Sequence, residues 1–210
     1  MKLAIFGATG ETGKQLVSQA LTEGNIVIAY IRNPSKLEIK HECMTIIEGK
    51  LTDKTAIECA VSKVDEVLSV LGPRGDSKSK PITQGMQNII SAMGKNNVHR
   101  LIISSKLSLS DQNDLPDFKS RILINLVKLI NRAAYEDIVN AGKVVRSSNL
   151  EWTIIRLPLL NNNPKSGKVK VGYLGRKEVG LKISRADIAD FMLKLLQDTK
   201  YIRKSPAISN

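Results

Sequence analysis

Aromatic residues and cysteines are scarce in this sequence. Phe, Trp and Tyr make up 4% of the 210 residues, and Cys43 and Cys59 are the only cysteines. Surfaces that bind nucleic acid usually combine clustered Lys and Arg with interleaved aromatic residues. Here the basic residues behind the net charge of +12 are spread along the whole chain. We interpret the charge mainly as general surface charge, and the sequence disfavours nucleic acid as a partner.

The two cysteines have no paired spacing, and histidine is rare as well, with only His41 and His99. We expect the cysteines to be small buried residues in a reducing compartment, not a disulfide or metal ligands. We expect both histidines to be exposed. No metal site is predicted.

Long hydrophobic runs are also missing. No apolar run approaches the roughly 18 residues that a membrane-spanning helix needs, so no membrane association is predicted. Met1 and Lys2 lead directly into an apolar segment, so we expect no cleavable signal peptide. An apolar share of 42% and a charged share of 25% are typical of globular proteins. We expect one domain over residues 1–210, located in the cytoplasm.

Apolar runs of strand length alternate with helical patterns along the chain. Near-continuous apolar runs are typical of parallel strands that helices cover on both faces. The alternation predicts an α/β fold with a doubly wound, mostly parallel sheet. The expected strands are 3–6, 26–31, 44–47, 66–71, 100–104 and 152–157, with shorter candidates at 169–173 and 179–183; the expected helices are 14–23, 54–61, 82–96, 118–147 and 185–197.

The first thirty residues contain the most specific motif. An apolar strand is followed by Gly7-x-x-Gly10-x-x-Gly13, an amphipathic stretch and a second apolar strand. This βαβ pattern is typical of a dinucleotide site, because glycines let the backbone approach the pyrophosphate and the helix start offers unpaired N–H groups. The predicted cofactor-binding residues here are Gly7, Ala8, Thr9, Gly10, Glu11, Thr12 and Gly13.

The end of the second strand indicates which dinucleotide is bound. A carboxylate there would accept hydrogen bonds from both ribose hydroxyls, but this chain has Arg32, with Lys36 four residues later. Two cations favour the 2′-phosphate of NADP(H). The sequence therefore predicts NADP(H) over NAD(H) by at least tenfold, about 1.4 kcal/mol.

The catalytic Tyr-x-x-x-Lys of conventional short-chain dehydrogenases is not found in its usual place. Tyr135 lies in the expected helix, but the residue four positions later is Val139. Tyr173 and Lys177 match the spacing formally, in a glycine-containing segment past the sixth strand. Acid–base chemistry would then depend on the substrate, on solvent or on another group.

Five segments together resemble a known family. They are residues 4–13 (AIFGATGETG), 31–36 (IRNPSK), 71–76 (LGPRGD), 102–105 (IISS) and 183–192 (ISRADIADFM). The chain resembles the atypical short-chain dehydrogenases/reductases of the NmrA-like, NAD(P)H-binding type, and within them the biliverdin reductase B/flavin reductase branch. The resemblance implies a Rossmann fold that binds NADPH and passes hydride to flavins or related ring systems.

The resemblance also assigns roles to residues. Gly7 to Gly13 would hold the pyrophosphate, and Arg32 with Lys36 the 2′-phosphate. Ser105, at the end of the fifth strand, is the candidate catalytic residue, as a positioner of the nicotinamide. The family usually has an aspartate near the adenine where this chain has Lys50, so the backbone of Leu51 is expected to serve there. The remaining residues expected beside the cofactor are Leu71, Gly72, Arg74, Ser104, Pro158 and Leu159.

Two functional hypotheses follow. The first is an NADPH-dependent oxidoreductase whose small-molecule acceptor is a flavin, a quinone or a similar ring, since such acceptors need no tyrosine acid. The alternative is a non-catalytic NADP(H)-sensing regulatory or assembly protein. Epimerase activity is disfavoured because the catalytic tyrosine is not in its usual place. Biliverdin is disfavoured as the substrate because neither histidine is at a position that matches the branch. We interpret residues 118–138 as a helix packed on the sheet; a substrate flap or a dimer contact is the alternative. Whether the protein has a protein partner also stays open.

Overall fold

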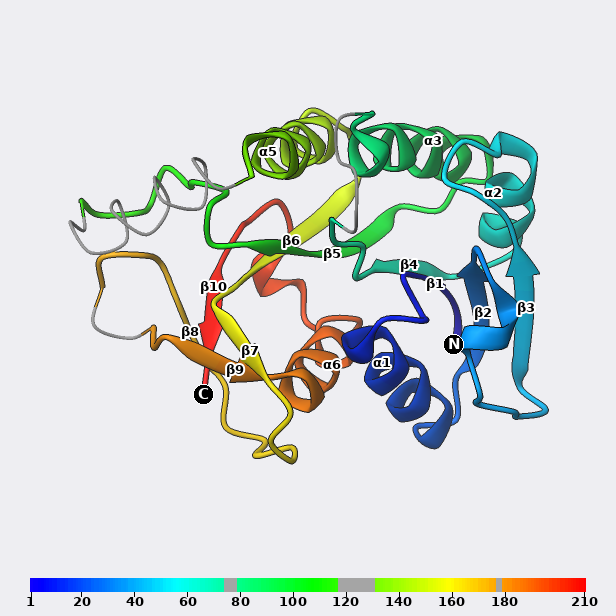
Figure 1. The fold of residues 1–210 in the computed structure, drawn as a ribbon, viewed down its shortest axis with the longest axis horizontal. Helices are drawn as coiled ribbons and strands as arrows, with labels where there is room; N and C mark the ends of the chain where they lie inside the picture. Colours follow the sequence, from blue (N-terminus) through cyan, green and yellow to red (C-terminus); the bar gives the residue numbers. More distant parts are fainter. Residues whose placement is uncertain (74–78, 117–130, 177–178) are drawn as a thin grey trace.

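The computed structural model describes residues 1–73, 79–116, 131–176 and 179–210. Helices cover both faces of a central sheet in these residues (Figure 1). The elements are β1 (Lys2–Phe6), α1 (Glu11–Thr22), β2 (Ile26–Ile31), η1 (Pro34–Lys36), β3 (Met44–Glu48), α2 (Lys54–Val61), β4 (Glu66–Ser69), α3 (Pro81–Lys95), β5 (Arg100–Lys106), α5 (Arg132–Arg146), β6 (Glu151–Leu157), β7 (Leu159–Asn161), β8 (Lys170–Gly172), β9 (Lys182–Ser184), α6 (Arg185–Lys194), η2 (Thr199–Tyr201) and β10 (Ala207–Ser209).

The strand order confirms the predicted doubly wound, mostly parallel sheet. The order is β3-β2-β1-β4-β5-β6-β10-β8, and every pair is parallel except the antiparallel pair β10–β8. The chain runs outward from β1 in both directions, so the order reverses between β1 and β4. In such sheets a ligand binds in the crevice at the carboxyl ends of the strands flanking this reversal. Strands β7 and β9 form a separate two-stranded sheet.

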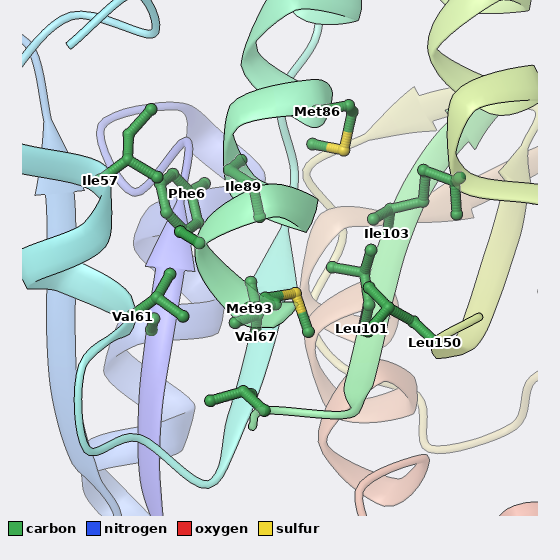
Figure 2. Close-up of a cluster of buried hydrophobic side chains, with 14 of the residues drawn as sticks. Phe6, Ile57, Val61, Val67, Met86, Ile89, Met93, Leu101, Ile103 and Leu150 are labelled. Atoms are coloured by element: carbon green, nitrogen blue, oxygen red, sulfur yellow. The ribbon is translucent and has the colours of Figure 1, made fainter. Parts of the chain in front are cut away.

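Successive residues of the central strands point to opposite faces, and both faces are buried. On β1, Ala4 and Phe6 belong to the core cluster beneath α2, α3 and α5, whereas Leu3 and Ile5 belong to the cluster beneath α1 and α6. Figure 1 shows these two helix layers on either side of the sheet. Figure 2 shows the first cluster, with Met86, Ile89 and Met93 of α3 above the strands. Two buried faces explain why the strands read as near-continuous apolar runs.

One predicted helix is wrong in its extent. The sequence predicts a single helix over 118–147, but Asn131 has a non-helical backbone, and its side chain accepts a hydrogen bond from the N–H of Ala134 at 3.0 Å. This N-cap starts a new helix, α5, at Arg132. Residues 118–130 of the predicted helix lie outside the described residues, so the choice between a packed helix, a flap and a dimer contact stays open.

Two helices begin at side-chain caps, and the predicted burial of the cysteines is wrong. Asp53 caps α2 by accepting from the N–H of Ala56, and Ser184 caps α6 by accepting from the N–H of Asp187. Cys43 and Cys59 are free thiols, but Cys43 is half-buried and Cys59 is exposed. Cys59 is exposed because the buried face of α2 is formed by Ile57, Ala60 and Val61 instead.

Candidate functional site

The turn between β1 and α1 is built around two glycines that no other residue could replace without movement. Gly7 has φ of +87°, and a Cβ there would lie 2.9 Å from the carbonyl carbon of Val70. A Cβ on Gly13 would lie only 2.1 Å from the carbonyl oxygen of Gly7. Helix α1 therefore starts in direct contact with the end of β1. This is the close approach that a pyrophosphate cradle requires.

The start of α1 is open to an anion. Gly10 occupies the N-cap position and offers no side-chain cap, so the first-turn N–H groups lack the partner that a Ser or Asp would supply. The positive end of the helix dipole adds to the attraction for a phosphate group. Glu11 lies in this turn, but its side chain is mostly exposed and lies 3.6 Å from the ammonium of Lys14. The cradle thus fits the pyrophosphate of a dinucleotide.

A cavity of about 510 Å³ opens beside this turn, at the carboxyl ends of β4, β5 and β6. It brings together seven of the predicted site residues: Thr12, Leu71, Gly72, Ser104, Ser105, Pro158 and Leu159. Sequence reasoning missed the other lining residues, which are Ser69, Val70, Pro73, Ile82, Met86, Ile103, Lys106, Leu107, Ser108, Ile138, Ala141, Gly142, Leu157, Leu160 and Leu181. Most of them are apolar and look like core residues in the sequence, so their pattern carries no separate signal.

The rim of the cavity is apolar and exposed. Leu159 is 63% exposed and Leu181 is 75% exposed, although both are large hydrophobic residues. The N–H of Leu159 donates to the carbonyl of Leu181 at 3.1 Å, next to the pairing of β7 with β9. The small sheet therefore holds two apolar side chains at the mouth of the cavity. Such a cavity suits a ligand with a large apolar surface.

Arg32 and Lys36 do not line this cavity. Arg32 follows β2 directly, and Lys36 ends the short turn η1, which Asn33 caps by accepting hydrogen bonds from the N–H and hydroxyl of Ser35. Both cationic side chains are exposed, and neither has an ion pair with any described residue. They stand on the β2 side of the sheet, whereas the cavity lies on the β4–β6 side. An extended dinucleotide across the switch point would reach both places.

Lys50 and Leu51 lie after β3, and their carbonyl oxygens already accept hydrogen bonds. Tyr30 donates its hydroxyl to the carbonyl of Lys50, and Asn88 donates its amide to the carbonyl of Leu51, both at 2.7 Å. Burial, together with the nearby charge of Asp53, raises the pKa of Tyr30 to about 12. The phenol thus remains a donor at neutral pH and fixes this turn. The expected adenine contact at Leu51 stays a prediction.

The structure also locates the tyrosines. Tyr135 is in the first turn of α5 and lines a second, smaller cavity. Tyr173 follows β8, with its ring 5.9 Å from the guanidinium carbon of Arg156. No tyrosine is among the residues described around the larger cavity. Arg74 and Lys177 lie outside the described residues, so the predicted role of Arg74 stays a prediction.

Two carboxylates, the buried Asp137 and the half-buried Asp114, fix segments next to the cavity. Asp137 of α5 is fully buried and accepts hydrogen bonds from the N–H groups of Ile82 and Thr83, at the start of α3. Asp114 accepts from both terminal nitrogens of the buried Arg156, at 2.6 and 2.7 Å. Burial alone would raise the pKa of Asp114, but hydrogen bonds from Arg156 and from backbone N–H groups lower it below its ordinary value. The ionised pair anchors the segment that follows β5.

Comparison with known families decides what kind of protein this is. A family model described as NAD(P)H-binding matches residues 7–199. The chain belongs to this NAD(P)H-binding family. The membership agrees with the predicted resemblance and with the phosphate cradle at the start of α1. Among the described residues, no helix has both the length and the apolarity needed to cross a membrane.

Two of the curated relatives align with nearly the whole length of this chain. The UPF0659 protein YMR090W of Saccharomyces cerevisiae is 25% identical over 224 residues, covering 100% of this chain and 93% of the relative. The photosystem II assembly factor Ycf39 of Synechocystis is 23% identical, covering 98% of this chain. The chain spans only 61% of the length of Ycf39.

Solved structures of related folds superpose on the whole chain. A short-chain dehydrogenase/reductase from Veillonella parvula superposes with a TM-score of 0.82 at 23% identity, and the match covers 94% of the Veillonella chain. A structure from the same organism in complex with NADP has a TM-score of 0.79 at 24% identity, also over 94% of its chain. ChuY of Escherichia coli, described as an anaerobillin reductase, has a TM-score of 0.80 at 19% identity, over 97% of its chain. These likenesses establish the fold.

Proposed function

We propose that this family member is an NADPH-dependent oxidoreductase that reduces a flat, largely apolar acceptor of the flavin or quinone class. The observation that carries the proposal is the cavity of about 510 Å³ between the glycine turn and the carboxyl ends of β4, β5 and β6. It adjoins the phosphate cradle, and apolar side chains form most of its lining. A ring could therefore stack beside the reactive end of the cofactor, away from water.

The preference for NADP(H) rests on Arg32 and Lys36. Both are exposed cations at the end of β2 and lack ion pairs with described residues, so they are available to a phosphate group. A guanidinium can bind a phosphate through two parallel hydrogen bonds. The Veillonella parvula structure in complex with NADP, which shares the fold, is consistent with this proposal.

Bound NADPH would supply the hydride, and an acceptor of this class can take its proton from solvent. The protein itself would then contribute by positioning the nicotinamide and the acceptor and by excluding water from the cavity. Ser104 and Ser105, half-buried at the end of β5, orient the nicotinamide ring with their hydroxyls. Pro158 and Leu159 border the same space, and Leu159 and Leu181 shield the acceptor at the mouth. This division of roles explains a site without a Tyr-x-x-x-Lys motif.

The direct test is NADPH oxidation with a panel of acceptors: riboflavin, FMN, menadione and, as a negative control, a sugar nucleotide. The proposal predicts turnover with at least one ring acceptor and none with the sugar nucleotide. Tight binding of NADPH without turnover of any ring acceptor would contradict it. Location in the cytoplasm, and a homodimer or protein partner, remain predictions of the sequence.

The second candidate is a non-catalytic NADP(H)-sensing assembly or regulatory protein. Its support is the relative Ycf39, a photosystem II assembly factor, together with the missing tyrosine acid. This candidate predicts that a partner protein is captured with NADPH but not with NADP⁺, or the reverse. Capture that ignores the redox state of the cofactor would speak against it.

A further inference from the structure

Three leucines form an exposed apolar rim at the mouth of the larger cavity. They are Leu159 and Leu160 of β7 and Leu181, which directly precedes β9, and we call them the leucine rim. Leu159 and Leu181, at 63% and 75%, are the two most exposed large hydrophobic residues in the part of the chain that the structure describes. Exposed apolar side chains that gather at one place, unlike scattered ones, indicate a surface that meets a partner.

Exposed lysines lie next to the leucine rim. Lys182 of β9 pairs in register with Leu159 of β7. Lys170 of β8 pairs with Ser209 of β10, and the following residue, Asn210, donates its backbone N–H to the carbonyl of Lys182 at 3.1 Å. Both lysines are exposed, and neither has an ion pair with a described residue. Figure 1 shows β7, β8 and β9 together, at the end of the molecule away from β3.

The charge around the leucine rim is almost entirely positive. Residues 158–186 contain seven Lys or Arg and one acidic residue, Glu178, which lies outside the described residues. The carboxylates that come next along the chain, Asp187 and Asp190, are buried, at 0% and 5% exposure. Lys168 is a further exposed lysine without an ion pair to a described residue. No exposed carboxylate offsets the lysines in the described part of 158–190, so this face favours an anionic partner.

Leucines beside lysines fit the surface of an anionic membrane better than a protein. Lysine is depleted at protein–protein interfaces, where arginine and aromatic residues are enriched. At a membrane the long lysine side chain lies along the apolar surface and keeps its ammonium among the lipid phosphates. Protruding leucines enter the boundary between headgroups and acyl chains. A protein seated on the leucine rim would close the cavity, whereas a bilayer leaves its mouth open to apolar molecules dissolved in lipid.

We propose that the leucine rim and the lysines beside it dock this protein on an anionic lipid bilayer. Leu159 and Leu181 insert below the headgroups, and Lys168, Lys170 and Lys182 contact lipid phosphates. The mouth of the cavity then faces the lipid, so an apolar ligand enters without crossing water. The sequence-based prediction of no membrane association considered only spanning helices, and the leucine rim forms only when β7 and β9 pair. The inference goes beyond the proposed function and does not depend on it.

Sedimentation with lipid vesicles tests the inference. The full chain is mixed with vesicles of phosphatidylcholine alone, or of phosphatidylcholine and phosphatidylglycerol in equal parts, and the bound fraction is measured at low and at raised salt. We expect the partition coefficient to be at least about tenfold higher on the anionic vesicles and to fall as salt is added. No binding to the anionic vesicles, or equal binding to both kinds, overturns the inference.

Leu181→Ser tests the apolar part of the surface. It should lower the partition coefficient on anionic vesicles by at least about tenfold, because it removes the most exposed side chain of the leucine rim. Ile26→Ser is the matched control, since Ile26 is 46% exposed at the start of β2, far from β7 and β9 in the strand order. It should leave binding unchanged. Equal losses from the two substitutions overturn the inference.

Lys170→Gln and Lys182→Gln test the charged part. Each should lower the partition coefficient about fivefold. Lys143→Gln is their control, because Lys143 is an exposed lysine of α5 and the substitution changes the net charge equally. It should have little effect. If all three variants lose binding alike, the attraction comes from the net charge of the whole protein and the inference is overturned.

Other partners give other results. A dimer in sedimentation velocity that Leu181→Ser dissociates would mean that the leucine rim covers a second copy of this chain, which overturns the inference. Undiminished vesicle binding by Leu181→Ser, with loss in the lysine variants, would indicate a site for an acidic protein and overturns it too. Vesicle binding without NADPH oxidation by any ring acceptor would support the docking surface and contradict the proposed reductase. Turnover without vesicle binding would do the opposite.

Discussion

Gly13 is the residue whose replacement the structure tolerates least. A Cβ there would lie 2.1 Å from the carbonyl oxygen of Gly7, which is backbone and cannot rotate away. Gly13→Ala should therefore push α1 away from β1. We expect a loss of about 1–3 kcal/mol in the free energy of unfolding and at least tenfold weaker NADPH binding. Urea unfolding and an NADPH titration measure the two effects.

Gly94→Ala is the control for this substitution, since it is also a glycine in a helix. Nothing lies within 4 Å of a Cβ built on Gly94. Alanine should stabilise the protein there by about 0.5–1 kcal/mol, because it lowers the entropy of the unfolded chain. Equal effects of the two substitutions would contradict the close contact between α1 and β1.

Arg32 sets the expected choice between the two dinucleotides. Arg32→Ala removes a cation that would face the 2′-phosphate, while NAD(H) has no such group. The variant should lose at least tenfold in affinity for NADPH, about 1.4 kcal/mol, and little in affinity for NADH. Fluorescence titration with both cofactors measures this. A similar loss for both cofactors would place Arg32 elsewhere than at the 2′-phosphate.

The glycine turn and the cations after β2 were predictable from the sequence because their chemistry is local. The positions of Gly7 after β1 and of Arg32 after β2 are set by their neighbours along the chain. The cavity lining was not predictable in the same way. Met86 and Leu181 are far apart in sequence and meet at the cavity only through the packing of the whole fold. Ser108 gave no signal, since an unpaired hydroxyl is visible only in three dimensions.

At the scale of the elements, the start of α3 depends on a residue far away along the chain. Its N-cap residue, Lys80, has φ of +48° and gives no side-chain cap. Asp137 of α5 takes that role by accepting from the N–H groups of Ile82 and Thr83, at 3.0 and 2.8 Å. The carboxylate thus joins α3 to α5, and Ile82 of α3 borders the cavity.

Asp137→Ala should destabilise the protein by about 3 kcal/mol, because the buried N–H of Ile82 and the partly buried N–H of Thr83 lose their acceptor. Asp53→Ala is the matched control, since Asp53 is an exposed local cap of α2. Its loss should cost about 1 kcal/mol. Urea unfolding of both variants measures the difference. Equal costs would contradict the role of Asp137 as a buried link between two helices.

Element prediction succeeded where apolar runs and caps are local. The second strand and the α2 helix have the predicted bounds, and α6 begins at the predicted residue, Arg185. Strands β7 and β10 were not predicted. Each has three residues, and β10 owes its place to pairing with β6 and β8. A three-residue segment has too little pattern to be recognised before its partners are known.

At the scale of the whole molecule, stability should depend on pH through Glu66. Its side chain is buried at the start of β4, at the other end of the strand from the cavity, and Glu66 pairs in register with Arg100 of β5. Burial raises the pKa of Glu66 to about 7, although the charge of Arg100 opposes the shift. Arg100 donates its hydrogen bonds to the carbonyls of Glu151 and Leu195 and to Thr153 instead. One Glu66 oxygen has no partner among the described residues.

Because the pKa of Glu66 is raised in the folded protein, its carboxyl does not lower the free energy of unfolding below the pKa of the unfolded chain. This stability is lost as the pH rises through about 7, the pKa in the folded protein. The advantage of Glu66→Gln over the wild type should therefore grow from near zero below about pH 4.5 to about 3 kcal/mol above pH 7. Urea unfolding across this range measures it. Glu42→Gln, at an exposed site, should show no such trend. An advantage of Glu66→Gln that is constant with pH would contradict the assignment.

The central claim is that NADPH held at the glycine turn passes hydride to a ring in the adjoining cavity. The most direct measurement is a single turnover with NADPH deuterated on one or the other face of C4, followed by mass spectrometry of the NADP⁺ formed. We predict that NADP⁺ from one form loses its deuterium and NADP⁺ from the other retains it, since a fixed site exposes one face. Bound NADPH that stays reduced with every ring acceptor, or equal loss of deuterium from both forms, would contradict the claim.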